Sequence, residues 1–205
     1  MSLNRLRFSG VRRRFGRLAV LDGAAGEVAG GEALLVTGRN GSGKSTLLRC
    51  LAGLVAPNAG TIELEEDGRR LGAAERRLRV GMVAPDLAFY EPLTVAENLA
   101  FFAKLRRVGP HRATELLARV GLPPDRLAGA LSSGMRQRLR WVWALLHRPR
   151  LLLLDEPFQN LDAAGEAAVR SLLDDHLADG RGLAVVANPS SLEVPRVAAR
   201  LDLGG

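Results

Sequence analysis

The sequence is poor in cysteine and contains no long apolar run. Its single cysteine, Cys50, excludes an internal disulfide, and because it follows two leucines we expect a small buried apolar residue. No stretch approaches the roughly 18 consecutive apolar residues that a membrane-spanning helix needs. Residues 1–16 are arginine-rich and lack the apolar segment of a secretory signal. We therefore expect a cytoplasmic protein.

Lysine and aromatic residues are also scarce. Lys44 and Lys104 are the only lysines, so arginine supplies nearly all of the positive charge behind the formal net charge of +7. A basic surface favours anionic lipids or nucleic acid, but these arginines are scattered along the whole chain, and no aromatic residues interleave with them for base stacking. We therefore expect no nucleic-acid partner. The composition is globular, and the length of 205 residues predicts one domain over residues 1–205.

Short apolar runs define the expected sheet. Runs without polar alternation predict buried strands at residues 33–37, 80–83, 151–154 and 183–187. Predicted helices cover residues 45–54, two segments between residues 94 and 117, and a segment from Ser132 whose Met135, Leu139, Val142 and Leu146 share one face. Buried strands separated by helices indicate a parallel sheet covered on both faces. The sequence therefore predicts an α/β fold with a helical subdomain inserted at about residues 86–148.

A glycine-rich loop follows the first of these strands. Residues 38–45 fit the phosphate-loop pattern of Gly, four residues, Gly, Lys and Ser or Thr. Glycines let backbone N–H groups turn toward phosphate oxygens, and the positive end of the next helix lies at the same place. We expect Lys44 to reach the β and γ phosphates of ATP and the Ser45 hydroxyl to ligate Mg²⁺; the alternative is a plain glycine turn. The expected nucleotide-binding residues of this segment are Gly38, Asn40, Gly41, Ser42, Gly43, Lys44, Ser45 and Thr46.

Two carboxylates follow the strand at residues 151–154. Ligands bind at the C-terminal ends of the strands in open α/β sheets, which is where Asp155 and Glu156 stand. We expect Asp155 to help hold Mg²⁺ and Glu156 to accept the proton of the attacking water. Acidic residues often end strands without any catalytic role, so this pair indicates chemistry only together with the phosphate loop.

The segment LeuSerSerGlyMetArgGlnArg at residues 131–138 distinguishes among families of nucleotide enzymes. It resembles the LeuSerGlyGlyGln signature of the ABC family: Ser132 and Gly134 match it, whereas Ser133 and Met135 depart from it. The resemblance implies that Ser132, Gly134 and the N–H groups at this helix start bind the γ phosphate of an ATP held by a second subunit. A plain helix cap is the alternative.

Two further segments resemble the ABC family. Residues 159–162 are similar to the loop that meets the opposite subunit in such dimers. Phe15 lies 29 residues before Lys44, where the family places an aromatic side chain that stacks on adenine. A strand residue packed in the core is the alternative reading of Phe15.

Two positions depart from the family pattern. The glutamine that normally follows the strand at residues 80–83 is missing, and Pro85 or Asp86 stands there. Asn188 occupies the place of a histidine that hydrogen-bonds the γ phosphate. Because Asn188 donates a hydrogen bond but cannot become cationic, we predict that the chain binds ATP and hydrolyses it slowly, with Glu156, Lys44 and Asn188 as the catalytic set.

The resemblance covers nearly the whole chain. It implies a P-loop NTPase (RecA-like) core with a parallel sheet, an N-terminal antiparallel β edge and the inserted helical subdomain. It also implies an ATP-hydrolysing motor subunit of an ABC transporter, similar to the small haem exporter subunits, that works as a homodimer with separate transmembrane subunits on the inner face of the cell membrane. Two alternatives stay open: a soluble ABC ATPase acting on ribosomes or nucleic acid, and an ATP-binding regulator with negligible hydrolysis.

Overall fold

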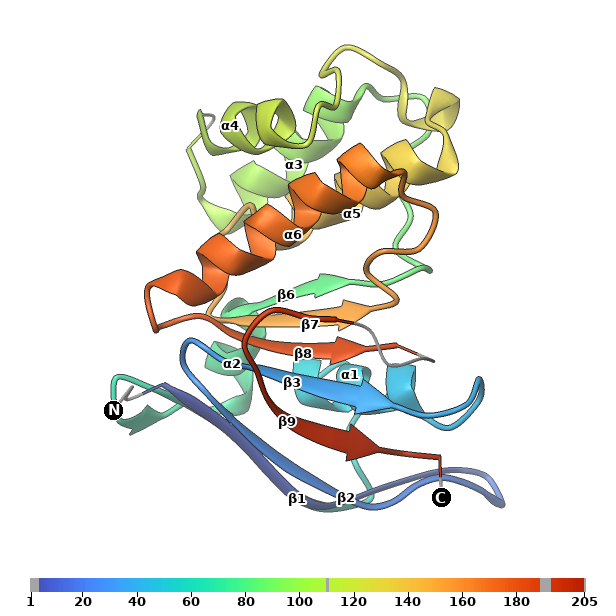
Figure 1. The fold of residues 1–205 in the computed structure, drawn as a ribbon, viewed down its shortest axis with the longest axis vertical. Coiled ribbons are helices and arrows are strands. Elements are labelled where there is room, and N and C mark those ends of the chain that lie inside the picture. Colours follow the sequence, from blue (N-terminus) through green and yellow to red (C-terminus); the bar gives the residue numbers. More distant parts are fainter. Residues whose placement is uncertain (1–3, 110, 189–192, 205) are drawn as a thin grey trace.

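The described residues form two β-sheets. The computed structural model describes residues 4–109, 111–188 and 193–204. One sheet is parallel, with the strand order β6-β7-β8-β3-β9, and the other is antiparallel, with the order β2-β1-β4-β5 (Figure 1). The parallel strands are β3 (Ala33–Thr37), β6 (Val80–Val83), β7 (Leu151–Asp155), β8 (Leu183–Ala187) and β9 (Val197–Asp202). The antiparallel strands are β1 (Arg5–Phe15), β2 (Leu18–Ala29), β4 (Ala59–Glu66) and β5 (Arg69–Arg70).

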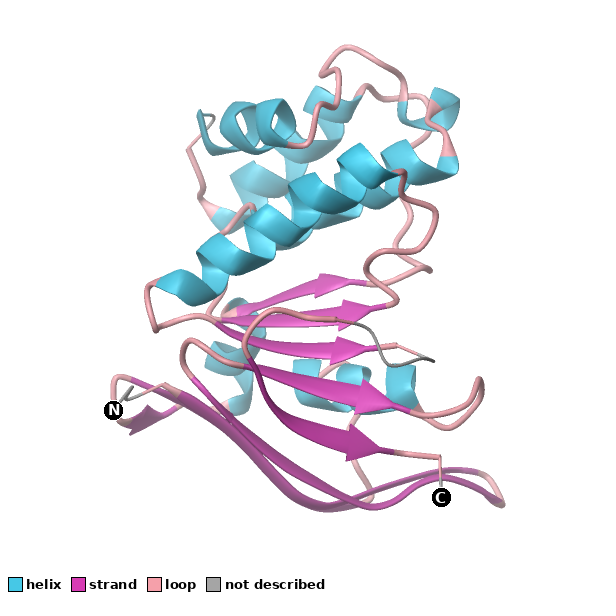
Figure 2. Ribbon diagram, in the orientation of Figure 1, coloured by secondary structure: helices cyan, strands magenta, loops and turns pink. Residues whose placement is uncertain are grey.

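Helices cover both faces of the parallel sheet (Figure 2). Helices α3, α4, α5 and α6 gather on one face, while α1 lies between the parallel sheet and the antiparallel sheet on the other. None of the helices in the described ranges combines the length and the hydropathy of a membrane-spanning segment. The helices are α1 (Lys44–Ala52), α2 (Ala73–Leu78), α3 (Val95–Arg106), α4 (His111–Arg119), α5 (Ser133–Leu145) and α6 (Ala163–Ala178), with a 3₁₀ turn at Ala128–Ala130.

The position of strand β7 explains why apolar and polar residues do not alternate in its sequence. Successive side chains of a strand point to opposite faces of the sheet. Leu152 and Leu154 therefore pack with α5 and α6, whereas Leu151 and Leu153 pack with α1 and the antiparallel sheet. All four leucines are fully buried. A strand with an apolar layer on each side must be apolar at every position, so the uninterrupted leucine run follows from its central place.

The expected architecture is present, and the differences are local. Strands β3, β6 and β8 have the predicted bounds, and β7 is one residue longer because it includes Asp155. The predicted antiparallel edge takes the form of a separate four-stranded sheet. Cys50 is buried in α1, as expected. Leu139 and Val142 of α5 are fully buried, and so is Leu146, which directly follows this helix. Helices α2 and α6 and strand β9 were not predicted from the sequence.

Candidate active site

The candidate site lies where three parallel strands end. Register places Val36 of β3 and Asp155 of β7 beside the same residue of β8, Ala187. The backbone N–H of Glu156 donates to Ala187 O at 2.9 Å, and that of Asn188 donates to Val36 O at 3.1 Å. The phosphate loop, the Asp155–Glu156 pair and Asn188 therefore meet at one edge of the sheet, the edge at which α/β proteins bind ligands.

Glycines give the loop after β3 its shape. Gly43 has a φ of 98° and immediately precedes α1, and a Cβ atom there would lie 2.6 Å from the carbonyl oxygen of Val20. Gly38 has a φ of 143°, and a Cβ atom there would lie 2.6 Å from Ser42 Oγ. Glycine is required at both places. Since Gly43 has no side chain to cap α1, the first N–H groups of the helix remain available to an anion.

The loop borders a cavity of about 250 Å³. The cavity lining consists of Val20, Asn40, Gly41, Gly43, Lys44, Ser45, Thr46, Asp155 and Glu156. Lys44 is only 6% exposed, and its Nζ donates to the carbonyl oxygens of Gly38 and Arg39 at 2.6 and 2.9 Å. The buried Ser42 hydroxyl has no hydrogen-bond partner among the described residues. A buried ammonium group and an unpaired hydroxyl in one loop fit an anionic ligand.

Asp155 and Ser45 place two oxygen ligands side by side. Asp155 is 4% exposed, and burial raises the pKa of its carboxyl group, while a hydrogen bond from Ser45 and the charges of Arg49 and Lys44 act in the opposite direction. No group of three or more His, Cys, Asp or Glu side chains suited to a metal occurs in the described part of the chain. Mg²⁺ takes one or two protein oxygens and completes its shell with phosphate oxygens and water, so the Ser45–Asp155 pair fits Mg²⁺.

Glu156 stands at the rim of the same cavity. It follows β7 with a φ of 47°, an uncommon backbone conformation for a residue other than glycine. Its backbone is held on both sides, because its N–H donates to Ala187 O and its carbonyl oxygen accepts from Gln137 Nε2 at 3.3 Å. This anchored backbone directs a half-buried carboxylate toward the cavity.

Phe15 lies at the end of β1, next to the turn into β2. Figure 1 shows this turn at the same end of the molecule as the loop between β3 and α1. The Phe15 side chain is 48% exposed, so it is not a core residue, and the Arg13 guanidinium lies 4.4 Å from its ring centroid. Phe15 and Asn188 are not among the residues that line the 250 Å³ cavity.

Ser132 and Gly134 also lie outside that cavity. Ser132 is the N-cap of α5, and its hydroxyl accepts a hydrogen bond from the backbone N–H of Met135 at 3.2 Å. Gly134 packs against the loop that follows Glu156, since a Cβ atom there would lie 2.7 Å from the carbonyl oxygen of Asn160. The helix cap that the sequence left as an alternative is thus present. A cap of this kind does not prevent the helix start from binding an anion.

The loop with the missing glutamine is held by arginines. Asp86 forms an ion pair with Arg49 at 2.8 Å, and Arg140 of α5 donates to the carbonyl oxygens of Pro85 and Leu87. Sequence reasoning missed Val20, Gln137 and Arg140 as parts of the site. No local pattern marks them, because their roles depend on contacts with residues distant in the sequence.

Comparison with known proteins gives consistent matches. The family model described as "ABC transporter" matches residues 21–159. "Phosphonates import ATP-binding protein PhnC 2" of Synechococcus sp. is 37% identical over 97% of this chain and 81% of its own length. "Cytochrome c biogenesis ATP-binding export protein CcmA" of Rhodopseudomonas palustris is 40% identical over 90% of this chain and 92% of its own length. The solved "Structure of ATP binding subunit of ABC transporter" superposes with a TM-score of 0.78 at 27% identity, covering 89% of this chain and 79% of that one.

Proposed function

The chain belongs to the ABC transporter family as one of its ATP-binding subunits, which are ATPases, and on that premise we propose that it is the motor of an exporter. The observation that carries the proposal is the convergence of Lys44, the Ser45–Asp155 pair and Glu156 on one cavity. The chain is similar to both import and export proteins, so the direction of transport is part of the proposal. The exporter assignment is supported by the LeuSerSerGlyMet variant and by 40% identity over nearly all of an export protein.

The residues around the cavity have distinct roles in this proposal. The backbone of the loop and the side chains of Lys44 and Thr46 hold the phosphates of ATP, and Ser45 and Asp155 hold Mg²⁺. Mg²⁺ bound there would neutralise negative charge on the phosphate oxygens. Glu156 accepts a proton from the attacking water, and Asn188 donates a hydrogen bond to the γ phosphate. The remaining residues proposed to bind the phosphates are Gly38, Asn40, Gly41, Ser42 and Gly43, and Phe15 is proposed to stack on adenine.

A second copy of the chain completes the site in this proposal. Ser132 and Gly134 stand at a helix N-terminus outside the cavity of their own chain, where N–H groups can bind an anion that another molecule presents. A homodimer places the helix start of each copy on the ATP of the other. The loop at residues 159–162, which packs against Gly134, would meet the partner.

The membrane partner is proposed to dock in a groove between α3, α5 and β6. This cavity of about 420 Å³ has apolar side chains, including Met82, Phe102 and Trp143. It also contains arginines at residues 77 and 106, and the ion pair of Arg49 with Asp86. Its composition suits an amphipathic cytoplasmic segment of a separate transmembrane subunit that carries acidic residues. Docking there would place the chain peripherally on the inner face of the cell membrane, without a nucleic-acid partner.

Replacement of the proposed catalytic base tests the function. In Glu156→Gln we expect the Mg-ATPase rate to fall by about 100-fold or more, in the range of general-base contributions, while ATP affinity is retained. Lys44→Ala should lose ATP binding, and the exposed carboxylate variant Asp174→Asn should match the wild type in both measurements. An unchanged ATPase rate in Glu156→Gln would instead support the nucleotide-binding regulator that Asn188 makes plausible.

A further inference from the structure

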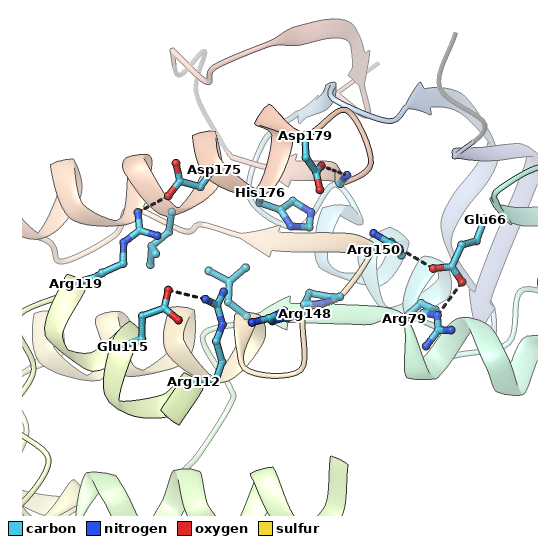
Figure 3. A pocket seen from close by; sticks show the side chains of 14 residues that line it. Glu66, Arg79, Arg112, Glu115, Arg119, Arg148, Arg150, Asp175, His176 and Asp179 are labelled. Carbon is cyan, nitrogen blue, oxygen red and sulfur yellow. Dashed lines mark hydrogen bonds and ion pairs between the residues drawn. The ribbon is translucent and has the colours of Figure 1, made fainter. Parts of the chain in front are cut away.

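A second, strongly charged cavity lies at the opposite edge of the parallel sheet from the phosphate loop. Arg79 directly precedes β6, Arg150 precedes β7, and Gly182 precedes β8; all three line this cavity of about 640 Å³. Helices α4 and α6 form its other walls (Figure 3). We call it the arginine cavity because its lining includes five arginines: Arg79, Arg112, Arg119, Arg148 and Arg150.

The carboxylates of the arginine cavity do not balance its arginines. Its lining contains four carboxylates, Glu66, Glu115, Asp175 and Asp179, against the five guanidinium groups. Glu66 is shared by two of these groups, Arg79 at 2.8 Å and Arg150 at 2.6 Å. Arg112 pairs with Glu115 and Arg119 pairs with Asp175. Asp179 accepts hydrogen bonds from the backbone N–H groups of Arg181 and Gly182.

Two donors in the arginine cavity lack an acceptor. Within the described ranges Arg148 forms no ion pair, and Figure 3 shows it between Arg112 and Arg150 without a dashed contact. The Nε–H of Arg112 is buried and has no hydrogen-bond partner in the part of the chain that the structure describes. A buried donor without an acceptor destabilises the structure, and a ligand that accepts from it removes that cost. Arg148 is exposed, so it contributes an unpaired positive charge rather than a buried donor. The buried donor of Arg112 and the charge of Arg148 together favour an anion with several oxygen atoms.

We propose that the arginine cavity binds a small phosphate-bearing metabolite at a site separate from the nucleotide site. Guanidinium groups match phosphate oxygens through paired hydrogen bonds, and Leu145 and Leu172 in the lining offer apolar contact to the rest of the ligand. Glu115 and Asp175 leave 52% and 62% of their side chains exposed, and these negative charges disfavour docking of an anionic membrane surface. The ligand is thus proposed to be a free phosphate compound rather than a lipid headgroup.

Such a ligand would join separate elements of the fold. Arg112 belongs to α4, whereas Arg148 and Arg150 belong to the segment that leads into β7. A phosphate group bound to both would hold α4 against the core of the parallel sheet. Since ligand binding to the folded state stabilises it, occupancy should raise the unfolding temperature in a saturable way.

Pyrophosphate is a suitable probe, provided that the phosphate loop cannot bind it. We would titrate pyrophosphate into Lys44→Ala by calorimetry, and repeat the titration on the native chain saturated with MgADP. In either form we expect one saturable site whose affinity falls by about tenfold or more in Arg148→Gln and Arg112→Gln, as expected for loss of a charged hydrogen bond. Arg200→Gln removes the same charge from an exposed position of β9, outside the arginine cavity, and should leave the affinity unchanged.

Three outcomes would overturn the proposal. One is the absence of saturable binding in both Lys44→Ala and the MgADP-saturated chain. Another is an equal loss of affinity in Arg200→Gln and Arg148→Gln, which would indicate a diffuse charge effect. The third is binding to phosphatidylglycerol vesicles that depends on Arg148 and Arg112 while free pyrophosphate does not bind. None of these outcomes bears on the ATPase test of Glu156, so the two proposals fail separately.

Discussion

Arg140 donates a hydrogen bond to the side-chain oxygen of Gln137 at 3.0 Å, and both residues belong to α5. Arg140 also donates to the carbonyl oxygens of Pro85 and Leu87, and Gln137 Nε2 donates to those of Glu156 and Pro157. The pair thereby connects the loop that lacks the family glutamine to the loop that carries the proposed catalytic carboxylate. Gln137 is 3% exposed, so solvent cannot readily replace these hydrogen bonds.

Substitution of Arg140 should weaken this connection. In Arg140→Ala we expect a loss of about 1.5–3 kcal/mol in the free energy of unfolding and a several-fold lower ATPase rate, because the charged hydrogen bonds to the loop at Pro85 and Leu87 and to Gln137 are removed. ATP affinity should change little, since Arg140 does not line the nucleotide cavity. Denaturant unfolding and steady-state kinetics measure these effects. Arg140→Lys should recover only part of the lost stability and ATPase rate, because one ammonium group cannot reproduce the guanidinium geometry. An unchanged ATPase rate in Arg140→Ala would contradict a role of the Arg140–Gln137 pair in catalysis.

Phe15 should contribute to ATP affinity through base stacking. Stacking on an aromatic side chain is worth about 1–3 kcal/mol, so Phe15→Ala should raise the Kd for ATP by about tenfold, while Phe15→Trp should preserve it. Leu18→Ala is the matched control, because Leu18 is 66% exposed and pairs with Phe15 across the turn. Fluorescence titration with ATP would show the difference, and equal Kd values for Phe15→Ala and Leu18→Ala would exclude the stacking role.

Asn188 should limit the rate of ATP hydrolysis. In Asn188→His a side chain that can carry positive charge replaces a neutral donor, and charged hydrogen bonds are stronger by about 1–2 kcal/mol. We therefore expect kcat to rise by about tenfold with little change in ATP affinity. Asn188→Ala should lower kcat further. A kcat in Asn188→His at or below that of the wild type would show that this position does not control turnover.

His147 should make stability depend on pH. Burial lowers the pKa of His147 to about 4, and the charge of Arg106 adds to this effect, while the hydrogen bond to Val80 O opposes it. Because the unfolded histidine has the ordinary pKa of about 6.5, the unfolded state binds the proton first, and stability falls as the pH drops from about 6.5 toward 4.

The variant His147→Gln isolates this titration. Between pH 7 and pH 5 the wild type should lose about 2 kcal/mol of unfolding free energy more than the variant does. Denaturant melts at the two pH values measure the difference, and all other titrating groups are common to both proteins. Parallel losses in the two proteins would show that His147 is not the titrating group.

Local patterns predicted much of the fold and of the candidate site. Gly38, Gly43 and Lys44 lie within seven residues, so the spacing alone identifies the phosphate loop. The run of four leucines likewise identifies β7 as a buried strand. Helix α6 was missed although Val169, Leu172, Leu173 and Leu177 recur at helical spacing along its buried side. Strand β9 was missed because every second residue is only half-buried at the edge of the sheet.

By itself the sequence determined the phosphate loop, the acidic strand end and the family resemblance, because each depends on residues close together in the chain. Only the tertiary structure decided that Arg140 and Gln137 connect two loops, and that arginines 79, 112 and 150 line one cavity. The two loops lie tens of residues apart in the sequence, and so do the three arginines. Their proximity arises from the order of the strands and from the packing of α4 and α6 over the sheet, which no local pattern encodes.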